Sequence, residues 1–205
     1  MKAVGSGVQS QITDCDHDKI HPHRHWQNNQ CVWTQVPKNA NMMIRKICGK
    51  LQMTNTDKPD RTLPERVCVI RNPRTRLISA LGEYSKRKKD HRPLRALLEH
   101  LCEDATGFDE HLEPQSWYLQ EITYTHILKF EQLDTEIYTV PTFAQHRSVV
   151  DTVIRPQRLT YSKHHSGDLQ DIIEEHQDLV EQCVEKYYAL DQDIWQNTDK
   201  YQNTE

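Results

Sequence analysis

The fold is decided by the stretch Val67-Cys-Val-Ile-Arg71-Asn-Pro-Arg-Thr-Arg76-Leu-Ile-Ser79 and by an earlier stretch of the same layout, Cys31-Val-Trp-Thr-Gln-Val-Pro-Lys38-Asn-Ala-Asn-Met-Met-Ile44. Each begins as a short β-branched and apolar run, typical of a strand, and passes through a cation into the periodicity of a helix. Because parallel strands end at one edge of a sheet, Lys38 and Arg71 are expected at the same edge, beside two helix N-termini. Such N-termini carry unpaired N–H groups and partial positive charge. The edge is therefore expected to bind a ligand with anionic groups at both ends.

Strands and helices are expected to alternate along most of the chain. The expected strands cover residues 31–36, 66–71 and 124–130, and the expected helices cover residues 41–51, 94–101, 115–121, 168–188 and a segment that begins at Pro73. Residues 54–65 are expected to form a loop, and residues 134–166 are interpreted as short strands or loops. This alternation predicts an α/β fold with a mostly parallel central sheet flanked by helices. The 205 residues are divided into a polar, histidine-rich lead-in at residues 1–30 and a single domain at residues 31–205.

The charge of the chain is nearly balanced overall but uneven along its length. A net charge of −4 excludes a generally basic coat for nucleic acid. Nine Lys and Arg residues lie between Arg71 and Arg95, whereas nine Asp and Glu residues lie between Asp168 and Asp193. An anion site in the basic half agrees with this distribution, and a solvated helix face is the alternative. No run approaches about 18 apolar residues and the N-terminus lacks a signal-peptide pattern, so no membrane span is expected and a cytoplasmic location is predicted.

The cysteines and histidines are interpreted as structural or surface residues rather than as metal ligands. The six cysteines show no Cys-x-x-Cys spacing and are interpreted as buried free thiols of a reducing cytoplasm. They are Cys15, Cys31, Cys48, Cys68, Cys102 and Cys183. In the lead-in, surface histidines are favoured over a metal site. The histidines in question are His17, His21, His23 and His25.

The first strand-to-helix junction differs from the phosphate-binding loop of nucleoside triphosphatases. That loop has the pattern Gly-x-x-x-x-Gly-Lys-Ser/Thr, in which the glycines let the backbone wrap the phosphates and the hydroxyl binds Mg²⁺. The segment from Pro37 to Asn41 has neither a glycine nor a hydroxyl side chain. An ordinary nucleoside triphosphatase or nucleotide kinase is therefore not expected.

Five segments, in family order along the chain, resemble motifs of sulfotransferases, and of Golgi-type carbohydrate sulfotransferases in particular. Val36-Pro-Lys-Asn-Ala40 is similar to their 5′-phosphosulfate loop, and Val69-Ile-Arg-Asn-Pro-Arg-Thr-Arg-Leu-Ile-Ser-Ala80 is similar to their 3′-phosphate segment. Asp109-Glu-His-Leu-Glu-Pro-Gln115 resembles the histidine-containing motif that ends in Pro-Gln. Ile127-Leu-Lys-Phe-Glu-Gln-Leu133 resembles the Lys-Phe-Glu-x-Leu strand end, and Tyr187-Tyr-Ala-Leu-Asp191 resembles the terminal Tyr-x-x-Asp.

The resemblance implies a P-loop-like sulfotransferase fold and a donor, 3′-phosphoadenosine 5′-phosphosulfate, with anionic groups at both ends of its ribose. It implies that the residues at the 5′-phosphosulfate are Pro37, Lys38, Asn39, Ala40, Asn41 and Met42. Arg71 and Ser79 would hold the 3′-phosphate, while Arg76 either assists or is a surface arginine. Met42 and Met43 stand where the family usually has Thr or Ser. Backbone N–H groups and the amides of Asn39 and Asn41 are therefore the alternative phosphate ligands.

Four side chains are candidates for the chemistry of sulfuryl transfer. Lys38 is expected to stabilise charge on the leaving phosphate oxygen, because a cation already aimed at that oxygen needs no reorganisation. His111 is the first candidate for the base that takes the acceptor's proton, since histidine titrates near neutral pH, and Glu113 is the second. Glu131 is expected at the same edge of the sheet, where an ion pair with Lys38 or Arg71 explains it equally well.

The expected function is therefore that of a soluble sulfotransferase that modifies a hydroxyl acceptor, by resemblance a carbohydrate, without a metal ion. Nucleic acid is not an expected partner. One alternative is a catalytically inactive nucleotide-binding protein of the same fold. Another is a polyanion or nucleic-acid binder that uses the basic segment at residues 86–95. Trp33 and Trp117 are expected to pack in the core rather than to stack on adenine or a sugar.

Overall fold

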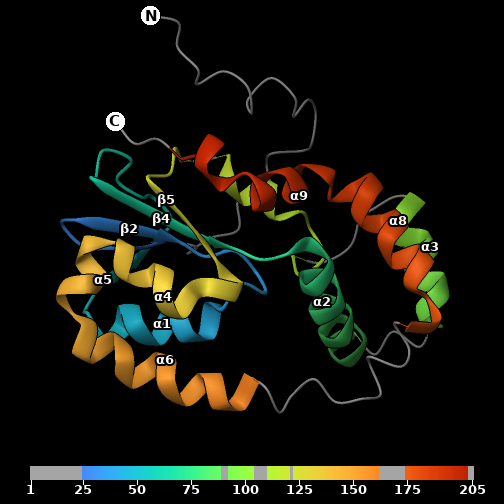
Figure 1. Cartoon of the computed structure of the whole chain (residues 1–205), viewed down its shortest axis with the longest axis horizontal. Coiled ribbons are helices and arrows are strands. Elements are labelled where there is room, and N and C mark those ends of the chain that lie inside the picture. The colour runs from blue at the N-terminus through green and yellow to red at the C-terminus, as the bar shows by residue number, and fades with distance from the viewer. Residues whose placement is uncertain (1–24, 89–91, 104–109, 121, 162–173, 203–205) are drawn as a thin grey trace, which may run out of the picture.

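A computed structural model of the chain describes residues 25–88, 92–103, 110–120, 122–161 and 174–202. It shows an α/β fold in which five strands form one open sheet, in the order β3-β1-β2-β4-β5 (Figure 1). The strands are β1 (His25–Gln27), β2 (Cys31–Thr34), β3 (Thr54–Thr56), β4 (Glu65–Ile70) and β5 (His126–Lys129). The prediction of an α/β fold is confirmed.

The sheet is mixed, so the prediction of a mostly parallel sheet is wrong. β4 pairs in parallel with β2 and β5, whereas β1 pairs antiparallel with β2 and β3. The short link between β1 and β2 explains the difference. Oδ1 of Asn28 accepts hydrogen bonds from the backbone N–H groups of Gln30 at 2.9 Å and Cys31 at 2.8 Å, which closes a hairpin too short for a parallel connection. β3 lies within the segment that was expected to be a loop.

His25 belongs to β1 and is buried, so its interpretation as a surface histidine is wrong. Its Nδ1 lies 3.0 Å from Oγ1 of Thr34 in the adjacent strand. His17, His21 and His23 lie outside the described residues. Within the described part of the chain, no group of three or more His, Cys, Asp or Glu side chains is arranged to hold a metal ion.

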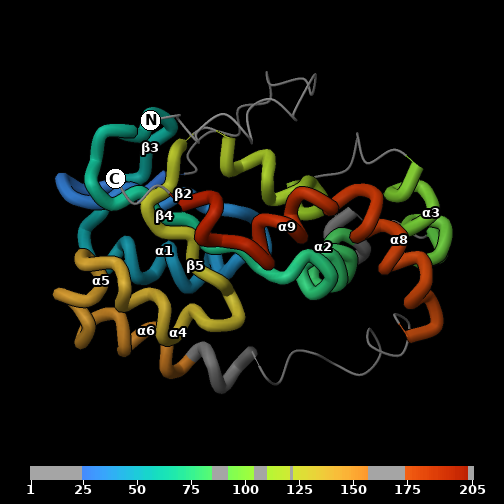
Figure 2. Tube along the Cα trace, turned by 45° about the horizontal axis from the view of Figure 1, so that its top comes forward, coloured from blue at the N-terminus to red at the C-terminus, as the bar shows by residue number. Residues whose placement is uncertain are grey.

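Helices cover both faces of the sheet and form a further group beside it (Figures 1 and 2). One face carries α1 (Asn41–Lys50), α4 (Leu133–Glu136), α5 (Pro141–Gln145) and α6 (Arg147–Tyr161). The other carries α9 (Ala189–Gln196) and the 3₁₀ helix η1 (Gln115–Leu119). The group beside the sheet consists of α2 (Pro73–Lys88), α3 (Leu94–Glu103) and α8 (Gln177–Tyr187). Short 3₁₀ turns are η2 (Phe130–Gln132), η3 (Ile137–Thr139) and η4 (Thr198–Lys200).

Neighbouring residues of the central strands enter two different hydrophobic clusters. Trp33 packs edge-on against Phe143 of α5, with ring centroids 5.3 Å apart. Val32 and Cys68 instead pack with Ile194 of α9 on the opposite face. Both faces of β2 and β4 are thus buried, which explains their continuous apolar sequences. The expectation that Trp33 belongs to the core is confirmed.

The C-terminal part of the chain is more helical than its sequence indicated. Residues 134–161 lie almost entirely in helices, so their interpretation as short strands or loops is wrong, while residues 162–166 of that segment lie outside the described residues. Pro141 occupies the first turn of α5, where proline removes no intrahelical hydrogen bond, and Pro156 lies inside α6. The helix expected at residues 168–188 is seen as α8, and residues 168–173 lie outside the described residues.

Cys102 of α3 and Cys183 of α8 form a disulfide, with Cα atoms 5.0 Å apart. Their interpretation as free thiols is therefore wrong, whereas Cys31, Cys48 and Cys68 are free and buried as expected. Burial raises the pKa of these three thiols above its ordinary value. Because disulfides persist mainly in oxidising compartments, the cysteines no longer support a cytoplasmic location. None of the described helices combines the length and apolar character needed to cross a membrane.

Reducing this disulfide is expected to lower the free energy of unfolding by about 2–4 kcal/mol. The reason is that the bridge joins cysteines 81 residues apart and so restricts the unfolded chain. Denaturant unfolding with and without a thiol reductant measures the change. The double variant Cys102→Ala/Cys183→Ala is the control, since its stability should not respond to reductant. Six titratable thiols in the unfolded, unreduced protein would contradict the bridge. That count includes Cys15, which lies outside the described residues.

Candidate functional site

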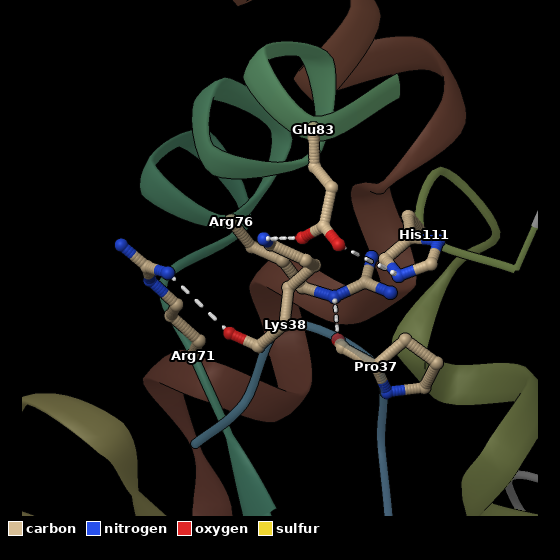
Figure 3. Close-up of polar contacts among 6 residues, drawn as sticks. All are labelled: Pro37, Lys38, Arg71, Arg76, Glu83 and His111. Atoms are coloured by element: carbon tan, nitrogen blue, oxygen red, sulfur yellow. Dashed lines mark hydrogen bonds and ion pairs between the residues drawn. The ribbon is translucent and has the colours of Figure 1, made fainter. Parts of the chain in front are cut away.

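The loop between β2 and α1 contains two residues in an unusual backbone conformation. Lys38 and Ala40 have φ angles of 67° and 63°, in the left-handed region that residues other than glycine rarely adopt. The N–H of Asn39 donates to the Val36 carbonyl at 3.2 Å, and the N–H of Ile44 donates to the Ala40 carbonyl at 3.0 Å as α1 begins. Such strain persists only where the surrounding structure enforces it, and it is concentrated at functional sites. The Lys38 side chain extends from this turn toward α2 (Figure 3).

The side chain of Gln115 joins this loop to the end of β4. Its Oε1 accepts hydrogen bonds from Nδ2 of Asn39 at 2.9 Å and from the backbone N–H of Arg71 at 3.0 Å, and its Nε2 donates to the Arg71 carbonyl at 2.8 Å. Nδ2 of Asn39 also donates to the Val69 carbonyl at 2.8 Å. Both amide hydrogens of Asn39 are therefore engaged inside the protein. Asn39 positions the loop, and its amide is not available as a substitute phosphate ligand.

Asp191 of α9 fixes Gln115 in turn. The backbone N–H groups of Gln115 and Ser116 each donate to one carboxylate oxygen of Asp191 at 2.8 Å. Burial raises the pKa of Asp191, while the positive charge of Arg76 and the N–H donors act in the opposite direction. The buried carboxylate thus joins the Pro-Gln segment at the start of η1 to the Tyr-x-x-Asp segment at the start of α9.

Arg71 and Lys38 are neighbours at the carboxyl ends of the parallel strands β4 and β2. Nη1 of Arg71 donates to the Lys38 carbonyl at 3.3 Å (Figure 3), and its Nε donates to Oγ1 of Thr75 at 3.1 Å. The guanidinium lies 4.6 Å from the ring centroid of Phe130. Ser79 follows Thr75 by one turn of α2. The backbone and these contacts bring the two predicted anion-binding segments into direct contact.

Glu83 of α2 lies between the two predicted catalytic side chains (Figure 3). Its Oε2 is 2.5 Å from Nζ of Lys38, and its Oε1 is 3.8 Å from Nε2 of His111. The side chains of Lys38, Glu83 and His111 are 17%, 27% and 12% exposed, so the cluster is partly shielded from water. Glu83 was not predicted as a site residue. The available signal was its spacing of seven residues from Arg76, which places both on one face of α2.

Arg76 is buried next to this cluster, so the alternative of a surface arginine is wrong. Its Nε donates to the Pro37 carbonyl at 3.0 Å and its Nη1 donates to the Glu113 carbonyl at 2.7 Å. Nη2 is also buried and has no hydrogen-bond partner within the part of the chain that the structure describes. Arg76 therefore ties the first loop to the segment that carries His111, and Figure 3 shows its contact with Pro37.

The other predicted binding residues lie on the surrounding helices. Asn41 begins α1, and its buried Oδ1 has no hydrogen-bond partner among the residues described. Met42 follows it and is 72% exposed. Trp117 meets Tyr187 edge-on, with ring centroids 6.3 Å apart, and is only partly buried, whereas it was expected to pack in the core.

The two further carboxylates have partners of their own. Glu113 accepts a hydrogen bond from the hydroxyl of Tyr118 at 2.6 Å. Glu131 accepts hydrogen bonds from the backbone N–H of Asn72 at 2.9 Å and from the indole N–H of Trp195 at 3.2 Å. Glu131 therefore braces the turn that leads from β4 into α2, while Lys38 forms its ion pair with Glu83.

Gln115→Ala is expected to lower the free energy of unfolding by about 1–3 kcal/mol, because it removes the shared partner of Asn39 and the Arg71 backbone in a buried environment. Urea unfolding measures the loss. Gln145→Ala is the matched control, since Gln145 is an exposed residue of α5 and its loss should change stability by less than about 0.5 kcal/mol. Equal losses in the two variants would show that Gln115 has no special structural role.

The site as described consists of two cationic strand ends, a buried amide that joins them and a carboxylate between Lys38 and His111. Comparisons of the chain with protein-family models, with curated proteins and with solved structures find no match. The site geometry and the sequence motifs that produce it are therefore the observations that bear on function.

Proposed function

We propose that the protein is a sulfotransferase with a P-loop-like fold, which moves a sulfuryl group from 3′-phosphoadenosine 5′-phosphosulfate to a hydroxyl acceptor. The observation that carries this proposal is the 3.3 Å contact between the Arg71 guanidinium and the Lys38 carbonyl. This contact joins two cationic residues that follow adjacent parallel strands, each of which leads into a helix. A compound with anionic groups at both ends of one ribose matches such a pair of cations.

The binding of the donor is assigned to both strand-to-helix segments. The loop from Pro37 to Met42 receives the 5′-phosphosulfate through the Lys38 ammonium and the N–H groups at the start of α1. Arg71 receives the 3′-phosphate because its planar guanidinium suits bidentate phosphate binding, and the Ser79 hydroxyl assists. Neither α1 nor α2 has an acidic residue in its first turn, although the Glu131 carboxylate accepts the N–H of Asn72 just before α2.

The reaction is an in-line displacement at sulfur. The acceptor oxygen forms a bond to sulfur, the bond from sulfur to the bridging phosphate oxygen breaks, and 3′,5′-bisphosphoadenosine leaves. Lys38 stabilises the charge on the leaving oxygen, and His111 takes the proton of the acceptor hydroxyl. His111 is preferred to Glu113 as the base, because the carboxylate of Glu113 already accepts a hydrogen bond from Tyr118.

A carbohydrate acceptor is proposed from the resemblance of five segments to carbohydrate sulfotransferases. Contacts between those segments agree with their belonging to one site. Gln115, at the end of the histidine-containing segment, bonds to the Arg71 backbone in the second segment and to Asn39 in the first. The same glutamine is held by Asp191, which ends the fifth segment. Segments separated along the chain thus form one network of contacts.

A nucleotide-binding protein without transferase activity is the second candidate, and two observations favour it. The ammonium of Lys38 is engaged by Glu83 at 2.5 Å, and the exposed Met42 provides no hydroxyl for a phosphate. This candidate predicts tight binding of 3′,5′-bisphosphoadenosine without transfer to any acceptor in a broad panel. The polyanion-binding alternative depends on residues 86–95, and residues 89–91 lie outside the described residues.

Lys38→Ala is expected to reduce turnover by about 10²-fold or more, because it removes the cation at the leaving oxygen. Release of 3′,5′-bisphosphoadenosine in the presence of a carbohydrate acceptor panel measures the rate. Lys46→Ala is the matched control, since Lys46 is an exposed residue of the same strand-to-helix unit and should retain the wild-type rate. Unchanged turnover in Lys38→Ala would remove this mechanism.

Arg71→Ala is expected to weaken binding of 3′,5′-bisphosphoadenosine by about tenfold or more, while adenosine 5′-phosphate, which lacks the 3′-phosphate, loses much less affinity. The difference between the two nucleotides separates loss of a phosphate contact from general damage to the site. Calorimetric titration of both nucleotides gives the two ratios. Equal losses for both would show that Arg71 does not bind the 3′-phosphate.

A further inference from the structure

We infer that Glu83 is a positioning residue that Lys38 and His111 share in turn, an inference that rests on the proposed function. Before substrates bind, the Glu83 carboxylate holds the Lys38 ammonium. When the anionic donor draws that ammonium to itself, the carboxylate is released to His111. Glu83 thereby couples occupation of the donor site to the orientation of the base.

The Glu83 carboxylate lies near both Lys38 and His111, but at unequal distances. The contact with Lys38, at 2.5 Å, is a charge-assisted hydrogen bond, whereas the separation of 3.8 Å from Nε2 of His111 is too long for one. The two contacts use different carboxylate oxygens, Oε2 and Oε1. A small movement of the carboxylate toward His111 would therefore close the second contact as the first one is given up.

The burial of the cluster makes this exchange energetically significant. All three side chains are less than a third exposed, so their charges are less screened than those of a surface ion pair. An incoming sulfate or phosphate group meets the Glu83 carboxylate as a like charge and competes with it for one ammonium. Glu83 therefore weakens donor binding in the resting protein. Removing its charge should make binding of an anionic nucleotide tighter.

The same carboxylate favours the chemical step. When His111 takes the proton of the acceptor hydroxyl, its imidazole becomes positively charged, and a carboxylate beside Nε2 stabilises that charge and orients the ring. The proton ends on His111, and Lys38 keeps its own protons throughout. Glu83 thus has opposite effects on the two stages, weaker binding of the donor and faster transfer. A residue with a merely structural role would not separate the two.

The test is Glu83→Gln, measured both for affinity and for turnover. The variant is expected to bind 3′,5′-bisphosphoadenosine about three- to tenfold more tightly, because the competing charge is gone. Its turnover with the carbohydrate acceptor panel is expected to fall by about tenfold or more. Glu83→Asp keeps the charge on a shorter side chain and should restore part of the turnover. Glu185→Gln, on the exposed face of α8, is the control and should match the wild type in both measurements.

The outcomes separate this inference from the proposed function. If the wild type binds no 3′,5′-bisphosphoadenosine, the proposed function itself fails. If the wild type binds the nucleotide and transfers sulfate, but Glu83→Gln binds it equally or more weakly, the role of Glu83 is overturned. Should Glu83→Gln fail to fold, Glu83→Ala decides the matter, since it also removes the competing charge and must also give tighter nucleotide binding. Unchanged or weaker affinity in a folded Glu83→Ala variant would then contradict the inference.

Discussion

The side-chain amide of Gln115 is the interaction on which the arrangement of this site depends. Its oxygen accepts hydrogen bonds from the Arg71 backbone N–H and from Asn39 in the neighbouring loop. Its nitrogen donates a hydrogen bond to the Arg71 carbonyl. A group with donors and an acceptor in one plane is needed for this, and an apolar or acidic side chain of similar size would leave buried partners unpaired. The two cationic loops therefore keep a fixed relation to each other through one buried residue from a third segment.

Support for Gln115 comes from the far end of the chain. Asp191 binds the first N–H groups of η1, and the adjacent Tyr188 donates its hydroxyl hydrogen bond to the Leu112 carbonyl at 2.5 Å. The α8 helix that precedes these residues is covalently joined to α3 by the Cys102–Cys183 bridge. Residues separated by about 150 positions thus cooperate at one site, which forms only when the whole fold is complete. Strain in the loop at Lys38 and Ala40 is tolerated because these contacts hold it.

The sequence predicted the elements nearest the site well and the surrounding architecture less well. Strands β2 and β4 and helices α1 and α2 were found because each has a strong apolar periodicity. The pattern that predicts their burial lies within a short stretch of sequence. The antiparallel β1 and β3 were missed because each has only three residues, most of them polar, and so leaves a weak strand pattern. The helices from α4 to α6 were missed because their prolines were interpreted as helix-breaking residues. The disulfide was missed because partners 81 residues apart meet only through the packing of α3 on α8. Within the site, Lys38, Arg71 and His111 were identifiable from motifs. The position of Glu83 beside Lys38, in contrast, depends on how α2 is rotated relative to the first loop.

In the proposed function, the Lys38 loop and the Arg71 segment bind opposite ends of one adenosine compound. A crystal structure of the protein with 3′,5′-bisphosphoadenosine would show this binding mode. The 5′-phosphate is expected within hydrogen-bond distance of the Lys38 ammonium and the N–H groups that begin α1, with the 3′-phosphate on the Arg71 guanidinium. A nucleotide bound elsewhere, or one that reaches only one of these two cations, would contradict it.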